Sequence, residues 1–185
     1  MQLIRFDWAI KKILRQKANF HVLEGFISSI IGRETKIRQI LESETNQEHE
    51  LQKLNRVDIL CEDHEANLFL VEVQVDYQYD YLLRMLYSVS RAVTEYMSRG
   101  SEYAKVRKIY SINILYFEPG LGTDYVYRGT TEFRGLHNKE ELEMDQRQLD
   151  KFSDARKFSD IYPEYWLINV TGFDELVRSY LAMLA

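Results

Sequence analysis

Acidic and amide side chains inside a strongly apolar stretch are the first candidates for chemistry in this sequence. Residues 68–75 read Leu-Phe-Leu-Val-Glu-Val-Gln-Val, a run that predicts a buried β-strand carrying Glu72 and Gln74. Because successive side chains of a strand alternate between faces, Glu72 and Gln74 share one face. Asp58 lies between two β-branched residues on a strand predicted for residues 56–62. A carboxylate buried among apolar groups costs on the order of several kcal/mol unless cations or hydrogen bonds compensate it, so two of them on adjacent strands indicate a divalent-metal site.

Each of these side chains also has a structural interpretation that the sequence alone leaves open. Asp58 could cap a turn or pair with Arg56, and Glu72 could pair with Arg84 on the helix that follows. Gln74 could be a core amide whose hydrogen bonds are satisfied locally. Arg84 could instead contact phosphate, although neutralisation of Glu72 is the favoured interpretation. The four histidines show no partnering Asp or Ser pattern, which argues against a histidine general base.

The elements that must position these residues predict a mixed α/β domain, with a central sheet flanked by helices. Residues 63–67 form a polar turn between the two strands, and with a strand at 35–41 they predict a three-stranded β-meander. Hydrophobic periodicity places helices at 6–16, 19–31, 79–99 and 173–184, and further strands at 108–117, 124–133 and 165–170; residues 138–151 are expected to be helical or irregular.

The long helix over 79–99 follows the strand that carries Glu72, so its orientation matters for the candidate site. Its apolar residues predict a buried side formed by Leu82, Leu83, Leu86, Val89, Val93, Tyr96 and Met97. In the earlier helix over 19–31, Asn19 is the expected N-cap, Gly32 the expected stop, and Glu24 lies beside the apolar stripe rather than opposite it.

The length and charge of the chain set the broad class. The 185 residues, with 45% hydrophobic and 29% charged side chains, suit a single globular domain over residues 1–185. The last predicted helix is still in phase at Ala185, so we expect it to be truncated there. The net charge of −5 taken alone disfavours non-specific nucleic-acid binding, but Lys and Arg gather in three clusters, so composition neither requires nor excludes DNA.

The single cysteine and the beginning of the chain bear on the compartment. Cys61 excludes an internal disulfide and fits a reducing cytoplasm, and its place in a predicted strand indicates a core thiol rather than a nucleophile. Residues 1–8 carry charge where a signal peptide needs its apolar segment, and no apolar run is long enough to span a membrane. We therefore expect a cytoplasmic protein that does not enter membranes.

Asp58, followed by Glu72-Val-Gln74 and then a long helix, is similar to the core of the PD-(D/E)XK nuclease superfamily, which has a restriction-endonuclease-like fold. More narrowly, the chain resembles the PD-(D/E)XK nuclease family transposases, also called recombination-promoting nucleases. The resemblance rests on seven segments in the expected order across nearly the whole chain: residues 6–14, 23–27, 57–59, 71–74, 81–84 with Tyr87, 131–135 and 161–165.

The resemblance implies a role for each matching residue. Asp58 and Glu72 would be the metal-binding carboxylates, with the backbone carbonyl of Val73 as a further ligand. Gln74 stands where the superfamily more often has Lys, and Glu24 matches a helix acid that some members use to support the metal. The implied cofactor is Mg²⁺, with Mn²⁺ as a substitute, because Mg²⁺ prefers hard oxygen ligands. The implied function is metal-dependent hydrolysis of phosphodiester bonds in DNA, associated with transposition or recombination.

Two departures from the superfamily pattern qualify what the resemblance implies. Val57 replaces the proline of the motif, a position that mainly shapes backbone. Gln74 cannot supply the cationic stabilisation that a lysine gives, although the narrower family also carries glutamine here. The alternative function is therefore a catalytically weak or inactive nuclease-fold module that binds nucleic acid or protein. Cleavage of DNA and of RNA are not distinguished, and a homodimer is expected only by analogy with two-strand cleavage.

Overall fold

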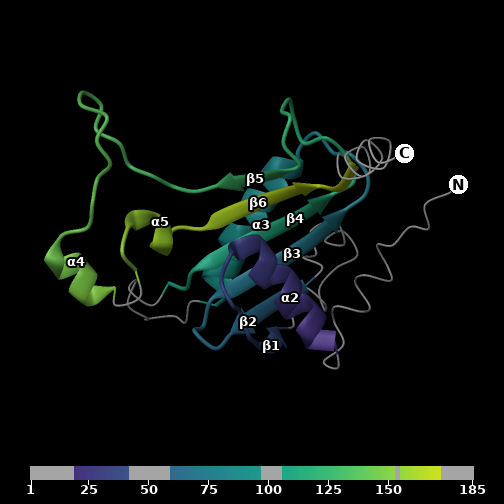
Figure 1. Cartoon of the computed structure of the whole chain (residues 1–185), viewed down its shortest axis with the longest axis horizontal. Coiled ribbons are helices and arrows are strands. Elements are labelled where there is room, and N and C mark those ends of the chain that lie inside the picture. Colours follow the sequence, from purple (N-terminus) through teal and green to yellow (C-terminus); the bar gives the residue numbers. More distant parts are fainter. Residues whose placement is uncertain (1–18, 42–58, 97–105, 153–154, 172–185) are drawn as a thin grey trace, which may run out of the picture.

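The computed structural model describes residues 19–41, 59–96, 106–152 and 155–171 (Figure 1). The helices predicted at 6–16 and 173–184 lie outside these residues, and so do Arg56 and Asp58. Two seven-residue strands, Leu68–Gln74 and Ile109–Leu115, and two helices, Phe20–Ile31 and Tyr81–Glu95, lie inside them.

A six-stranded mixed sheet forms the centre of the structure, in the order β1-β2-β3-β4-β6-β5. The antiparallel β1, β2 and β3 make the predicted meander, β4 and β6 run parallel to β3, and β5 is an antiparallel edge strand. The predicted α/β architecture is confirmed. The strands are β1 (Ile37–Leu41), β2 (Ile59–Asp63), β3 (Leu68–Gln74), β4 (Ile109–Leu115), β5 (Val126–Gly129) and β6 (Glu164–Asn169).

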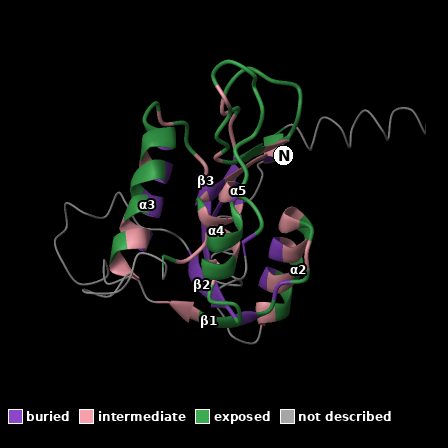
Figure 2. Cartoon of the chain, turned by 90° about the vertical axis from the view of Figure 1, so that its left-hand side faces the viewer, coloured by how far each residue is buried: buried purple, intermediate pink, exposed green. Residues whose placement is uncertain are grey.

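Two helices cover opposite faces of this sheet, α2 (Phe20–Ile31) and α3 (Tyr81–Glu95), as Figure 2 shows. The side chains of β3 divide between them. Phe69, Val71 and Val73 belong to the apolar cluster that contains α2 residues, whereas Leu68 and Leu70 pack with α3 residues. Because side chains alternate along a strand, Glu72 and Gln74 lie on the α3 face.

The ends of α2 agree with the sequence. Gly32 ends the helix with φ of 76°, the left-handed conformation that glycine adopts without strain, and its N–H donates to the carbonyl of Ser28. Asn19 occupies the N-cap position, but its side chain makes no capping hydrogen bond. The helix is therefore terminated by backbone geometry at its end and held by its buried Leu23 and Ile27 along its length.

The buried face of α3 differs from the predicted one. Leu82, Leu83 and Leu86 are 55%, 68% and 55% exposed, whereas the buried residues are Tyr81, Met85, Ser88, Val89 and Ala92. The prediction is confirmed for Val89 and is wrong for the three leucines, and the centre of the buried face is rotated by about one position, or about 100°. Val93 and Tyr96 pack partly buried against the core as predicted, and Met97 lies outside the described residues. The physical reason is polar: Tyr81 and Ser88 form hydrogen bonds with groups of the sheet, and these bonds turn the leucines toward solvent.

Two short helices lie near the amino end of β6, α4 (Gln146–Lys151) and α5 (Phe158–Ile161). Asp145 begins α4 with a capping box that it forms with Gln148, within the segment expected to be helical or irregular. The sequence did not predict α5, because four residues are too few to show a helical period. No helix in the described part of the chain is long and apolar enough to span a membrane.

Candidate functional site

The hairpin of β2 and β3 is pinned by its turn. The Asp63 carboxylate accepts hydrogen bonds from the backbone N–H of Glu65 at 2.9 Å and of Asn67 at 2.8 Å. Ala66 sits in the left-handed region with φ of 66°. An aspartate that binds backbone N–H groups ahead of it stabilises a tight turn, so the length of the turn is fixed.

A fixed turn also fixes the register of the hairpin, in which Ile59 is the partner of Val71. Glu72 follows Val71 directly, and Asp58 directly precedes Ile59. Asp58 lies outside the described residues, so its predicted metal-binding role is not tested.

Glu72 is a buried carboxylate at the carboxyl half of β3. The hydroxyl of Ser88 on α3 donates to its Oε1 at 3.2 Å. On the next strand Asn113 is its partner in register. The sequence predicted the burial of Glu72. It did not predict the contact with Ser88, because the predicted buried face of α3 did not include this serine.

A buried polar network anchors α3 over this part of the sheet. The Tyr81 hydroxyl donates to Asn113 Oδ1 at 2.9 Å, and Asn113 Nδ2 donates to Ser111 Oγ at 3.0 Å and to the carbonyl of Trp166 at 3.2 Å. Tyr81, Ser111 and Asn113 are all buried. The network therefore fixes where Ser88, two turns after Tyr81, meets Glu72.

Gln74 and Val73 end the same strand. The Gln74 amide donates to the carbonyl of Asp76 at 2.9 Å, so its side chain is engaged by the local backbone. Val73 points its buried side chain to the α2 face. The catalytic role of Gln74 and the use of the Val73 carbonyl as a metal ligand remain predictions.

Glu24 is not brought together with Glu72. Its Oε1 accepts a hydrogen bond from the backbone N–H of Ile37 at 2.8 Å, and its Oε2 lies 3.8 Å from Lys36 Nζ. These contacts hold α2 at the start of β1, on the opposite face of the sheet from Ser88. The structure supports a structural role for Glu24, and its predicted support of a metal remains untested.

Arg84 lies on α3 one turn before Ser88, on the side of the helix that turns toward the sheet. Its Nη1 donates to Gln78 Oε1, and its guanidinium carbon lies 5.9 Å from the centre of the Tyr81 ring. Within the described ranges it forms no ion pair with Glu72, and its buried Nε has no hydrogen-bond partner. The favoured interpretation, neutralisation of Glu72 by Arg84, is not what the structure shows.

The oxygen donors at this end of β3 suit a hard cation. Over residues 19–41, 59–96, 106–152 and 155–171, no group of three or more His, Cys, Asp or Glu side chains could hold a metal ion. One buried carboxylate with neighbouring backbone carbonyls is nevertheless the donor type that Mg²⁺ takes, because Mg²⁺ keeps several waters and needs only one or two protein carboxylates. The carboxylate and carbonyl oxygens at this end of β3 are therefore of the type that fits Mg²⁺.

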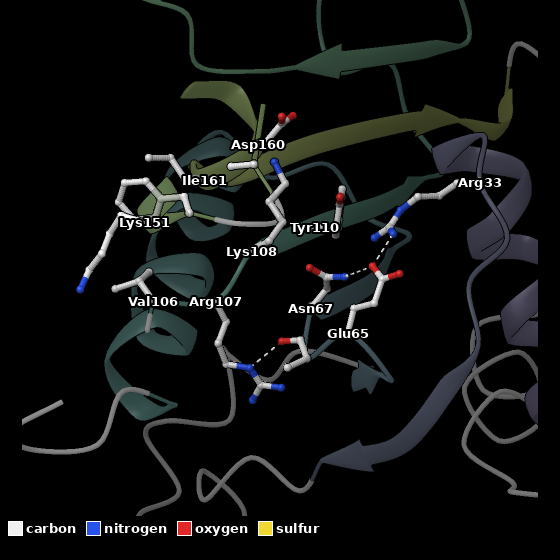
Figure 3. A pocket seen from close by; sticks show the side chains of 13 residues that line it. Arg33, Glu65, Asn67, Val106, Arg107, Lys108, Tyr110, Lys151, Asp160 and Ile161 are labelled. Carbon is white, nitrogen blue, oxygen red and sulfur yellow. Dashed lines mark hydrogen bonds and ion pairs between the residues drawn. The ribbon is translucent and has the colours of Figure 1, made fainter. Parts of the chain in front are cut away.

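A cavity of about 460 Å³ lies at the other end of the sheet, between the turn of the β2–β3 hairpin and the start of β4 (Figure 3). Arg33, Arg107, Lys108 and Tyr110 are among its lining residues. These three cations could suggest an anion-binding site, but each of them already has partners within the protein. Arg33 Nη1 donates to Glu65 at 2.7 Å, and Lys108 Nζ donates to the carbonyls of Ser159 and Tyr162, each at 2.7 Å.

Two buried glutamates near this cavity take up much of its positive charge. Of the lining cations, Arg107 lies 2.7 Å from Glu62 and Lys108 lies 3.5 Å from Glu164. Arg128, outside the lining, also donates to both oxygens of Glu164 at 2.9 and 3.1 Å. Burial alone would raise the pKa of Glu62, but hydrogen bonds from Arg107 and Gln39 and the nearby arginine charges lower it overall. Burial lowers the pKa of Lys108, against the opposing effect of Glu164.

Cys61 is a fully buried thiol on β2. Burial, and then the charge of Asp63, raises its pKa. A thiol held protonated is no nucleophile, so the prediction of a core cysteine is confirmed.

The comparison with protein families decides the relationship. A family model described as PD-(D/E)XK nuclease family transposase matches residues 4–165. The chain belongs to this family. The match covers Asp58, Glu72 and Gln74, and the mixed sheet with helices on both faces is consistent with the family's α/β fold. The comparisons with curated proteins and with solved structures find no match.

The family supports a function related to nucleic-acid cleavage and transposition. In the structure, two of the seven segments that resemble the family lie in contact although they are far apart in the sequence. Phe133, from residues 131–135, packs edge-on against Tyr162, from residues 161–165, with ring centres 5.5 Å apart.

Proposed function

We propose that this protein is a Mg²⁺-dependent endonuclease that hydrolyses phosphodiester bonds in DNA during transposition or recombination. The observation that carries the proposal is the buried Glu72 carboxylate, which a chain of this nuclease family holds on a hairpin of fixed register. We propose Mn²⁺ as a substitute for Mg²⁺, a homodimer as the form that cuts two strands, and the cytoplasm as the compartment.

Asp58, Glu72 and the backbone carbonyl of Val73 would hold the ion. Bound by such oxygens, Mg²⁺ supplies Lewis-acid polarisation of the phosphate and a water that ionises at lower pH. The support from the chain is the register, because Asp58 adjoins the partner of Val71 and Glu72 follows Val71.

The positive charge that a lysine would bring at residue 74 must come from elsewhere. Gln74 can only donate or accept hydrogen bonds. Arg84 is a cation on the helix that covers Glu72, and its Nε has no hydrogen-bond partner in the described part of the chain. We propose that Arg84 binds the DNA phosphate, the role that its lack of an ion pair with Glu72 leaves open to it.

Nicking of supercoiled plasmid DNA tests the proposal. Wild-type protein with Mg²⁺ or Mn²⁺ should convert the supercoiled form to the open circle, and Asp58→Ala and Glu72→Ala should abolish this conversion. Glu143→Ala is a matched control, because Glu143 is an exposed acid outside the β2–β3 hairpin. Nicking that persists at the wild-type rate in both alanine variants would refute the assignment.

A binding module with little hydrolysis is the second candidate. The bond from Gln74 to the Asp76 carbonyl favours it, because an amide held by the backbone is not poised to orient water. Titration of the protein with Mn²⁺ together with the nicking measurement separates the two candidates. Binding of the metal and of DNA without cleavage would support the module, whereas cleavage that depends on Glu72 would support the nuclease.

A further inference from the structure

Two serines on α3 use their hydroxyls in opposite ways. Ser90 is exposed, and its hydroxyl donates back to the carbonyl of Leu86 in the same helix at 2.8 Å. Ser88 is buried, and its hydroxyl instead donates across to Glu72 Oε1 at 3.2 Å. A helical serine has a backbone acceptor within reach of its own helix, so the bond from Ser88 to the sheet is a specific interaction with the carboxylate.

We propose that Ser88 is a positioning residue that fixes the orientation of the Glu72 carboxylate for metal binding. The inference rests on the proposed function, because it assumes that Glu72 is a metal ligand. Ser88 would not touch the metal or the DNA. It would act through Glu72, because its hydrogen bond to one carboxylate oxygen would hold the carboxylate in a single orientation.

The fold supports such a role because it fixes the donor as firmly as the acceptor. Tyr81 and Asn113 clamp the first turn of α3 to β4, and Asn113 is the register partner of Glu72. Ser88 follows Tyr81 by seven residues, two helical turns, on the same side of the helix. A rotation of α3 that buried Leu82 and Leu86 would break both the Tyr81 and the Ser88 hydrogen bonds.

The expected loss of metal affinity is that of a residue that binds a metal-ligating carboxylate without touching the metal itself. Hydrogen bonds to ligating carboxylates orient them, and their loss typically weakens metal affinity or activity by about 10–100-fold. The effect should appear in metal binding and in the Mg²⁺ concentration needed for cleavage, whereas a role in folding alone would leave both unchanged in protein that remains folded.

The test compares Ser88→Thr with Ser88→Val, two variants of nearly equal size of which one keeps the hydroxyl. Calorimetric titration of the full chain with Mn²⁺ well below the unfolding temperature should show wild-type affinity for Ser88→Thr and affinity weaker by about 10–100-fold for Ser88→Val. Ser88→Ala should weaken binding like Ser88→Val, and Ser90→Ala, the control on the same helix, should bind like wild type.

The outcomes separate this inference from the proposed function. If wild type binds Mn²⁺ and Ser88→Val binds it equally well, the role of Ser88 is wrong while the metal site stands. If wild type binds no Mn²⁺, or Glu72→Gln binds as well as wild type, the proposed metal site is wrong and the role of Ser88 falls with it. If Ser88→Ala does not fold, the Thr and Val pair decides alone, and equal loss in both would also overturn the inference.

Discussion

The two ends of the sheet can be compared through the buried glutamates that each end contains. Glu62 and Glu164, near the turn of the β2–β3 hairpin and the start of β6, are 6% and 4% exposed, and Glu72, toward the end of β3, is 7% exposed. The three carboxylates are therefore buried to nearly the same extent. Glu62 and Glu164 each face two cations, and Glu72 accepts a hydrogen bond from the neutral hydroxyl of Ser88 on α3.

This difference shows that buried charge alone does not mark a functional site. At the hairpin-turn end, opposite charges satisfy one another around a cavity, and the result is structural. At the carboxyl end of β3, a carboxylate is oriented by a hydroxyl on a helix that also carries Arg84. The cavity beside Arg107 and the buried Glu72 lie at opposite ends of β3, and the proposed function rests on Glu72 rather than on the cavity.

The largest effect should come from removing the charge of Glu72. Glu72→Gln keeps an oxygen that can accept the Ser88 bond but loses the metal-binding charge, so Mg²⁺-dependent nicking should fall by about 100-fold or more. Its free energy of unfolding should change by less than about 1 kcal/mol, because the amide retains that acceptor. Plasmid nicking and urea denaturation measure the two quantities. A large loss of stability with unchanged nicking would place Glu72 in the same class as Glu164.

The opposite pattern is expected for Glu164→Gln. Removing this carboxylate leaves Lys108 without its ion-pair partner, and Lys108 is buried to 10% side-chain exposure. Breaking a buried pair from one side costs about 3–5 kcal/mol. Urea denaturation should show this loss, while nicking by the folded variant, measured well below its unfolding temperature, should stay near the wild-type rate. A stable but inactive Glu164→Gln would contradict the contrast between the two ends.

Acid should reduce the stability that Glu62 contributes near the turn of the β2–β3 hairpin. Its folded-state pKa is lowered, so its charged form stabilises the fold at pH values above the ordinary value of 4.5, and this stabilisation is lost as the pH falls below 4.5 through the folded-state pKa. Wild type should therefore exceed Glu62→Gln in unfolding free energy at pH 7, and the difference should shrink toward pH 3. Denaturation curves across this range measure it, and a difference that grew on acidification would be contrary to this sign.

The smallest effect should come from the exposed ion pair of Arg33 and Glu65. The Glu65 side chain is 70% exposed. Hydrogen bonding with Arg33, and then the charge of Arg33, lowers the pKa of Glu65. Solvent and salt screen such pairs, so Glu65→Gln should cost about 0.2–1 kcal/mol, less in high salt. A loss of unfolding free energy as large as that of Glu164→Gln would mean that the exposure of an ion pair does not determine how much it stabilises this end of the sheet.

The sequence predicted the parts of the fold that simple periods encode. The alternation in β3 placed Glu72 and Gln74 on one face, and Gly32 ended α2 as expected. The face of α3 was mispredicted because hydrophobicity weighs leucine above serine and tyrosine, while the structure turns the helix to satisfy hydrogen bonds with Glu72 and Asn113.

The candidate site was predictable to a similar degree. Glu72 followed from a carboxylate in an apolar strand, and the family match supports the motif that contains it. The separation of Glu24 from Glu72 was not predictable, because it depends on which face of the sheet α2 covers. Ser88 was hidden for a related reason, since a lone serine in a helix carries no signal until the sheet beneath it is known.

A crystal soaked in Mn²⁺ gives the most direct test of the central claim, that the carboxyl end of β3 binds the catalytic metal and the hairpin-turn end does not. The account predicts an anomalous peak about 2.1 Å from a carboxylate oxygen of Glu72, with Asp58 as a second ligand, and no peak in the cavity beside Arg107. A peak confined to that cavity, or none at Glu72 at saturating Mn²⁺, would contradict it.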